Sequence, residues 1–80
     1  MMNVSYTEYA ENTIKDRIIS KKMIEEAFKK PDEIVKGKKG RKIIHKLIKD
    51  KLLRIVYEPQ ASTYLVITAY YAKPGRYMKP

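Results

Sequence analysis

The chain has 80 residues, of which 44% are hydrophobic, and this is enough for one domain with a modest core. Lys and Arg number 18 against nine Asp and Glu, so the net charge is +9. The apolar fraction excludes a disordered acidic tail, and the lack of cysteine excludes a disulfide-stapled scaffold. No apolar run reaches the roughly 20 residues of a membrane span, and no signal peptide is evident. We expect a small, basic, cytoplasmic domain.

The first part of the sequence predicts two short helices. Residues 7–18 place apolar and small side chains at helical spacing, and either Thr7 alone or Ser5 with Glu8 is a suitable N-cap. Residues 21–30 predict a second helix capped by Ser20. The proline that follows ends this helix, because proline disfavours helical geometry in the residue before it.

From residue 41 the hydrophobic period changes. Segments 41–48, 52–58 and 63–71 are rich in β-branched and aromatic residues and are predicted as strands. The turns at 49–51 and 59–62 are short, so the strands form an antiparallel meander.

These elements predict a single α+β domain over residues 1–80. Two N-terminal helices pack on one face of a three- to four-stranded antiparallel sheet, and Ile34 and Val35 supply the short fourth strand. Residues 72–80 are expected to form an irregular tail.

Pairing the second and third strands predicts which side chains share a face. The set expected beneath the helices is Leu53, Ile55, Leu65 and Ile67. The opposite face then carries Arg54, Val56, Tyr64, Val66, Thr68 and Tyr70. The first strand has two possible registers, one placing His45 in the core and the other placing it beside Arg54. We favour the second, because Lys46 would be costlier in the core than at the rim.

Positive charge is concentrated between residues 36 and 51, where eight basic residues accompany a single acid. Such asymmetry indicates a surface for a polyanion: RNA, DNA or an acidic protein. The alternative is a lysine-rich solvated surface, as in proteins that work at high temperature. The candidate nucleic-acid-binding residues are Lys38, Lys39, Arg41, Lys42, Lys46 and Arg17.

Metal and cofactor chemistry is not expected. The chain has no cysteine, one histidine and no carboxylate spacing typical of a metal site. Its glycines form neither a dinucleotide fingerprint nor a P-loop, and no nucleophile elbow is present. The segment 37–40 (GKKG) is better explained as a flexible basic turn than as a phosphate loop.

One remaining constellation suits RNA cleavage without a metal. That reaction needs a group to deprotonate the 2′-hydroxyl, positive charge for the phosphorane-like transition state and a donor to the leaving oxygen. The candidate catalytic residues are His45, Arg54, Arg76, Tyr70 and Tyr77, with Thr68, Tyr71, Lys15 and Arg17 nearby. His45 would be general base or acid, the arginines would hold the phosphate, and a tyrosine would orient or donate.

Each of these residues also has a structural explanation. His45 stands between apolar neighbours, as a hydrogen-bonded strand histidine does. Arg54 could form an ion pair with Glu58 or with an acidic residue of the helices, and Tyr70 and Tyr71 suit ordinary strand packing. Only their joint placement on one sheet face favours a site.

Three segments carry a family resemblance: 6–34 (YTEYAENTIKDRIISKKMIEEAFKKPDEI), 52–58 (LLRIVYE) and 64–71 (YLVITAYY). Together they resemble a family of small prokaryotic domains of unknown function in the RelE/ParE toxin superfamily, with the layout of BrnT-type toxins. Each motif is short, but their order covers nearly all of residues 5–77.

The resemblance implies a RelE-like fold. That superfamily includes ribosome-dependent or free endoribonucleases, gyrase poisons and members with no shown activity, so the resemblance implies one of these three cases. Arg76 and Tyr77 match the late Arg and Tyr of RelE-type ribonucleases. Tyr9 stands where the family pattern usually has His, and Asn12 where it often has Arg, so a purely binding member is also implied.

The resulting hypothesis is a toxin-like, metal-independent endoribonuclease acting on RNA, free or ribosome-bound. An acidic antitoxin protein is the partner that the resemblance implies. The alternative hypothesis is a non-catalytic module of the same fold that binds nucleic acid or protein.

Overall fold

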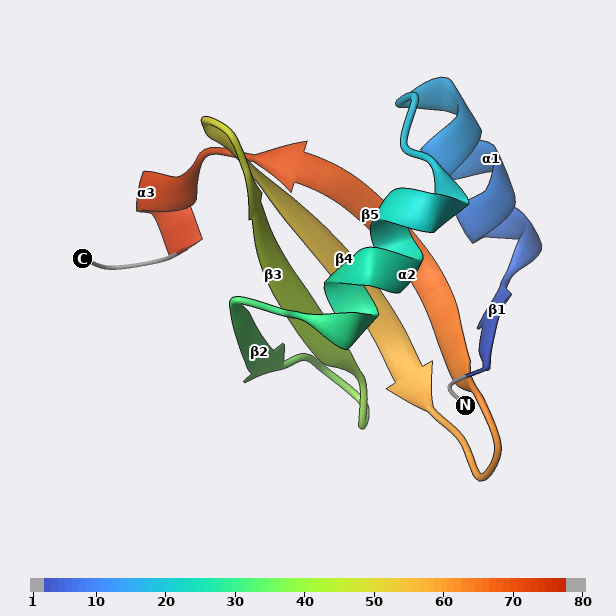
Figure 1. The fold of residues 1–80 in the computed structure, drawn as a ribbon. Coiled ribbons are helices and arrows are strands. Elements are labelled where there is room, and N and C mark those ends of the chain that lie inside the picture. Colours follow the sequence, from blue (N-terminus) through green and yellow to red (C-terminus); the bar gives the residue numbers. More distant parts are fainter. Residues whose placement is uncertain (1–2, 78–80) are drawn as a thin grey trace.

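The computed structural model describes residues 3–77. Its strands form one sheet, with helices on both sides (Figure 1). In chain order the elements are β1 (Val4–Tyr6), α1 (Glu8–Asp16), α2 (Lys21–Lys29), β2 (Glu33–Lys36), β3 (Lys42–Ile48), β4 (Lys51–Pro59), β5 (Tyr64–Ala72) and α3 (Pro74–Tyr77). Helices α1 and α2 cover one face of the sheet. We call the other side the far face.

The sheet has five strands in the order β1-β5-β4-β3-β2. Neighbours from β2 to β5 run antiparallel, whereas β1 pairs parallel with β5, with Val4 opposite Tyr64. The predicted α+β class is therefore confirmed. The predicted three- to four-stranded antiparallel sheet is wrong in strand number and in direction, because three residues of β1 give no alternation to detect.

Side-chain caps begin both N-terminal helices at the predicted residues. The Oγ1 of Thr7 accepts a hydrogen bond from the Ala10 backbone N–H, and the Oγ of Ser20 accepts one from that of Met23, each at 3.0 Å. Thr7 is thus the cap of α1, of the two alternatives in the sequence. Just beyond α1, Ile18 adopts a left-handed conformation with φ of 56°.

The core lies between α1, α2 and the near face of the sheet. Its fully buried members come from both helices and from the three central strands: Ala10, Ile24, Ala27, Ile44, Leu53, Ile55, Val66 and Ala69. Phe28 joins the layers, with its ring centroid 4.9 Å from that of Tyr57 and 5.3 Å from that of Tyr64. Fully burying one such large side chain contributes about 1.5–3 kcal/mol.

A β-bulge in β5 changes which residues face the core. Tyr57 pairs with Val66 and Val56 pairs with Thr68, so Ile67 has no partner on β4. The extra residue reverses the alternation of β5 on either side of it. The prediction that Leu65 and Ile67 lie beneath the helices is therefore wrong, and so is the placement of Val66 and Tyr64 on the opposite face.

The register of β3 is the one favoured from the sequence, with His45 opposite Arg54. The reason given for it is wrong, because this register puts Lys46 opposite Leu53 on the helix side. Lys46 avoids the cost of burial at the rim, where its Nζ donates to the Lys30 carbonyl at 2.8 Å and lies 4.0 Å from an Asp32 carboxylate oxygen.

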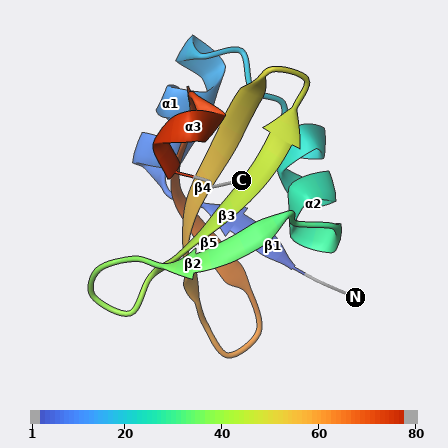
Figure 2. The same ribbon diagram turned by 90° about the vertical axis from the view of Figure 1, so that its left-hand side faces the viewer.

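The predicted irregular tail is partly helical. Pro74 begins α3, a position where proline loses no helical hydrogen bond. The short helix folds over the far face in front of β4 (Figure 2). The rest of the predicted tail, residues 78–80, lies outside the described residues.

Candidate functional site

Four polar side chains form a continuous row across the far face. Glu33 lies opposite His45, His45 opposite Arg54, and Arg54 opposite Tyr70, one residue from each of β2, β3, β4 and β5. We call these residues the cross-strand row. Directly opposite residues on neighbouring strands have Cβ atoms about 4.5–5.5 Å apart, so the pairing alone brings these side chains into contact.

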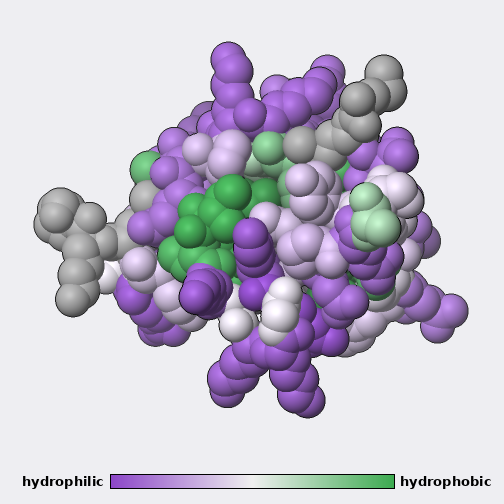
Figure 3. Space-filling model, turned by 90° about the horizontal axis from the view of Figure 1, so that it is seen from below, coloured by the Kyte–Doolittle hydropathy of each residue, from purple (hydrophilic) through white to green (hydrophobic). Residues whose placement is uncertain are grey.

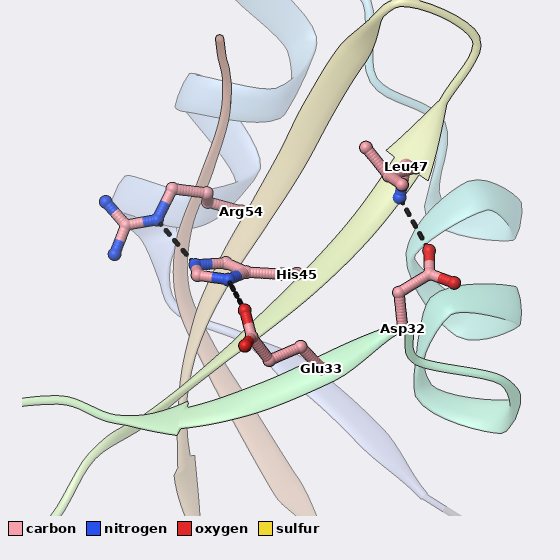
Figure 4. A network of polar contacts seen from close by, with 5 residues as sticks. All are labelled: Asp32, Glu33, His45, Leu47 and Arg54. Atoms are coloured by element: carbon pink, nitrogen blue, oxygen red, sulfur yellow. Dashed lines mark hydrogen bonds and ion pairs between the residues drawn. The ribbon is translucent and has the colours of Figure 1, made fainter. Parts of the chain in front are cut away.

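Hydrogen bonds connect the whole row, and Figure 4 shows the two that join Glu33, His45 and Arg54. The Nδ1 of His45 lies 2.7 Å from Oε1 of Glu33. The Nε of Arg54 donates to Nε2 of His45 at 3.1 Å, and its Nη1 donates to the Tyr70 hydroxyl at 2.7 Å. His45 therefore has both ring nitrogens engaged, and it is only 2% exposed.

Arg54 is a buried cation without a carboxylate partner. The residue is 9% exposed, and within residues 3–77 no acidic side chain lies at ion-pair distance from its guanidinium. Its two side-chain acceptors are an imidazole and a phenol hydroxyl. The ion pair with Glu58 considered from the sequence is instead made by Arg41, at a long 3.9 Å.

Aromatic rings and a second arginine surround this guanidinium. The Tyr77 ring of α3 lies over it, with 3.7 Å between the guanidinium carbon and the ring centroid. The Tyr70 ring lies near two arginines: its centroid is 5.5 Å from the guanidinium carbon of Arg54 and 5.9 Å from that of Arg17. Arg17 also donates to the Ala69 carbonyl, at 3.4 Å, at the edge of β5.

Asp32 holds β2 in the register that the row needs. Its backbone N–H donates to the His45 carbonyl at 3.0 Å, and its carboxylate accepts from the Leu47 N–H at 2.8 Å (Figure 4). Asp32 thereby fixes the start of a strand of only four residues. The next residue, Glu33, is placed beside His45 as a result.

The basic residues between 36 and 51 do not form one face. Lys38, Lys39 and Arg41 lie in the β2–β3 loop, and Lys42 begins β3. Lys46 is on the helix side, and the β3–β4 turn at the other end of β3 is roughly 20 Å from the loop. Seen from below, hydrophilic side chains project all round the molecule and border a smaller hydrophobic area (Figure 3).

The other predicted site residues lie at varying distances from the row. Arg76 is exposed on α3. Thr68 is on the far face opposite Val56, one pair beyond the row. Tyr71 points to the helix side, where its hydroxyl lies 4.0 Å from the Met23 sulfur.

The two positions noted from the sequence as departures from the resemblance share a surface hollow on α1. Tyr9 and Asn12 line it together with Thr13, Asp16 and Arg17. Because Arg17 also contacts Tyr70, this hollow borders the cross-strand row. A His at residue 9 or an Arg at residue 12 would have enlarged the set of polar groups there.

Sequence reasoning missed Glu33 as a site residue. Its signal was available in the short strand expected at Ile34 and Val35, because extending that strand by one residue places Glu33 opposite His45. Without the β2–β3 register the carboxylate could not be assigned to a partner.

None of the three comparisons, with protein-family models, with curated proteins and with solved structures, finds a match to this chain. In residues 3–77 no helix has both the length and the apolar character to cross a bilayer. Within the same range, no three His, Asp or Glu side chains gather as a metal-binding group. The cross-strand row and its surroundings are therefore the features from which a function can be inferred.

Proposed function

We propose that this protein is a toxin-like, metal-independent endoribonuclease that acts on RNA at the far face. The observation that carries the proposal is the buried Arg54 guanidinium without a carboxylate partner. A buried charge is costly unless it is paired, and a phosphodiester supplies the missing anion in a geometry that matches the guanidinium fork. The net charge of +9 favours the same class of ligand.

The phosphate would be bound by the arginines. The guanidinium carbons of Arg54 and Arg17 lie 5.5 Å and 5.9 Å from the Tyr70 centroid, so a phosphate near that ring would be attracted by both charges. Arg76, exposed on α3, adds a contact to the approaching chain. The Tyr70 hydroxyl accepts from Arg54 and keeps its own proton, which it donates to the leaving 5′-oxygen.

Proton abstraction would fall to His45. Its Nε2 takes the proton of the 2′-hydroxyl once the bound phosphate draws the Arg54 guanidinium away from that nitrogen. The Tyr77 ring must move aside for this, and in its new position it stacks on a base next to the scissile bond. As in other toxin-like proteins, an acidic antitoxin that covers the basic residues would be the natural inhibitor.

A second candidate function is RNA binding without cleavage. It is favoured by the state of His45, whose ring nitrogens are both engaged while its ring is 2% exposed. The departures at Tyr9 and Asn12 point the same way. In this case the row only anchors phosphate.

Cleavage of single-stranded RNA, with and without ribosomes and in excess chelator, tests the first function. We expect cleavage by the wild-type protein and a loss of about 100-fold or more in Arg54→Ala, the usual cost of removing a donor to the transition state. RNA affinity measured by fluorescence anisotropy should change only a few fold, because other cations hold the chain. Arg54→Gln repeats the test if the alanine variant does not fold.

Lys22→Ala is the control, since Lys22 is an exposed cation of α2, on the other side of the sheet from the cross-strand row. It should cleave as the wild type does. If the wild-type protein leaves RNA intact under all conditions and its expression does not arrest growth, the endoribonuclease proposal fails. Salt-dependent RNA binding that weakens in Arg54→Ala would then establish the second function.

A further inference from the structure

The hydrogen-bond chain fixes the position of the His45 proton. An arginine side chain carries donors only, so the His45 Nε2, which lies 3.1 Å from Arg54 Nε, must accept. A neutral imidazole has one N–H, which must then be on Nδ1. Nδ1 faces the Glu33 carboxylate at 2.7 Å, the shortest contact of the ring. Glu33 thus accepts the only proton that the ring has to donate.

We propose that Glu33 is a positioning residue: its carboxylate holds the His45 proton on Nδ1, so that the Nε2 lone pair holds the Arg54 guanidinium in its place on the far face. The same tautomer leaves Nε2 as the nitrogen that could take a substrate proton. This inference deepens the proposed function and, for its role toward RNA, rests on it.

The burial of His45 and Arg54 makes this dependence strong. His45 is 2% exposed and Arg54 is 9% exposed, so water is a poor substitute for either partner. If the proton moved to Nε2, two N–H groups would face each other between β3 and β4. Arg54 would then have no acceptor for its Nε–H, and its only remaining hydrogen bond within the cross-strand row would be the one to the Tyr70 hydroxyl.

Simple electrostatics predicts the opposite effect of removing Glu33. Losing a carboxylate near a phosphate site should strengthen RNA binding, and it should do so equally in Glu33→Ala and Glu33→Gln. The positioning role predicts weaker binding in Glu33→Ala alone. Gln retains a carbonyl oxygen that accepts from Nδ1, so Glu33→Gln should retain the tautomer without the charge.

The single histidine of the chain makes the test direct. A long-range ¹H–¹⁵N correlation spectrum of ¹⁵N-labelled protein, free of RNA, reports which ring nitrogen carries the proton. We expect Nδ1–H in the wild type and in Glu33→Gln, and a mixed or Nε2–H ring in Glu33→Ala. The Arg54 Nε–H resonance should shift in the alanine variant only. RNA affinity should fall a few fold there, and by no more than in Arg54→Ala, because Glu33 acts through that arginine and other cations also hold the RNA.

Glu58→Ala is the matched control, because the Glu58 and Glu33 side chains are 41% and 40% exposed and both come from the sheet. It should leave the tautomer unchanged.

A wild-type ring protonated on Nε2, or an unchanged ring in Glu33→Ala, would overturn the inference even if RNA binds. Conversely, the expected spectra in a protein that ignores RNA would support the positioning of Arg54 and reject the proposed function. If Glu33→Ala does not fold, Glu33→Leu, which also lacks an acceptor, takes its place in the comparison.

Discussion

Tyr6 carries a buried hydroxyl that makes no hydrogen bond within residues 3–77. Burial raises its pKa to about 12, with smaller contributions from the carboxylates of Glu25 and Glu11. Lys21 lies over the ring, 4.8 Å from its centroid, and this contact does not need the hydroxyl. The unpartnered Tyr6 hydroxyl therefore lowers the stability of the fold, because no hydrogen bond from the described residues compensates for its burial.

Tyr6→Phe should leave the free energy of unfolding at pH 7 unchanged or slightly higher, because it removes an unpartnered hydroxyl. The pH dependence should differ more. Below pH 10 the hydroxyl is protonated in both the folded and the unfolded state, and between pH 10 and about 12 the unfolded state loses its proton first. Stability therefore falls across this window in the wild type and less steeply in the variant. Urea denaturation between pH 8 and 11.5 measures the difference.

Tyr57 is the internal reference for that experiment. Burial also raises its pKa, so Tyr57→Phe should flatten the alkaline loss in the same direction. Its ring packs against Phe28, and phenylalanine would preserve that contact. An alkaline curve identical in wild type and Tyr6→Phe would show that the Tyr6 hydroxyl is open to solvent.

At the scale of elements, the end of α1 contains a strained residue. Ile18 has φ of 56°, a region in which a β-branched side chain is a genuine outlier, and it is 88% exposed. The backbone there closes the helix, with the Ile19 N–H donating to the Ile14 carbonyl at 2.8 Å. Glycine is the usual residue at this position of a helix C-terminus.

Ile18→Gly should stabilise the protein by about 0.5–1 kcal/mol, the left-handed penalty less the entropy cost of glycine. For a domain of this size that corresponds to a rise in Tm of about 4 °C by calorimetry. Ile18→Ala removes the exposed side chain but keeps Cβ, so its gain should be smaller. A lower Tm in the glycine variant would contradict the assignment of strain to this residue.

The elements also show where sequence reasoning succeeds. The caps Thr7 and Ser20 are local chemistry, and both helices begin where those residues predict. The bulge at Ile67 is not local, because it depends on how β5 meets β4. No residue type marks it, so an unbroken alternation predicts the wrong faces for Leu65 and Val66.

The candidate site, like the elements, is predicted only in part by the sequence. His45, Arg54 and Tyr70 share the predicted face, because their strand pairing lies on the unaffected side of the bulge. The cover provided by Tyr77 was not predicted, since it depends on a four-residue helix within an expected tail. Glu33 was missed for lack of the β2 register.

At the scale of the whole molecule, the β2–β3 loop and the first residue of β3 hold four adjacent cations, Lys38, Lys39, Arg41 and Lys42. Lys42 is three residues along β3 from His45, roughly 10 Å. A nucleic-acid strand bound at the cross-strand row is therefore within reach of this end of the sheet. The α2 surface on the opposite layer mixes lysines with Glu25 and Glu26 and offers no such concentration.

Replacing the four cations with glutamate should weaken RNA binding and flatten the plot of log K against log salt by about 3 units, since each phosphate neutralised on a single strand adds roughly 0.7 to the slope. Fluorescence anisotropy from 50 to 300 mM salt measures both quantities. Lys22→Glu with Lys29→Glu on α2 is the control and should change the slope little. Equal effects of the two charge reversals would mean that binding follows net charge alone.

The parallel pairing of β1 with β5 also affects how the chain is made. Asn3 and Tyr64 are joined by a backbone hydrogen bond of 2.9 Å, so β1 finds its neighbouring strand only about sixty residues later in the chain. Contacts so distant in sequence slow folding, because the intervening loop must close first. During translation, β1 must wait until β5 has left the ribosomal tunnel. A chain in which β5 has not yet been made therefore lacks a complete sheet, and any activity of the far face, which includes Tyr70 of β5, begins only after that strand has emerged.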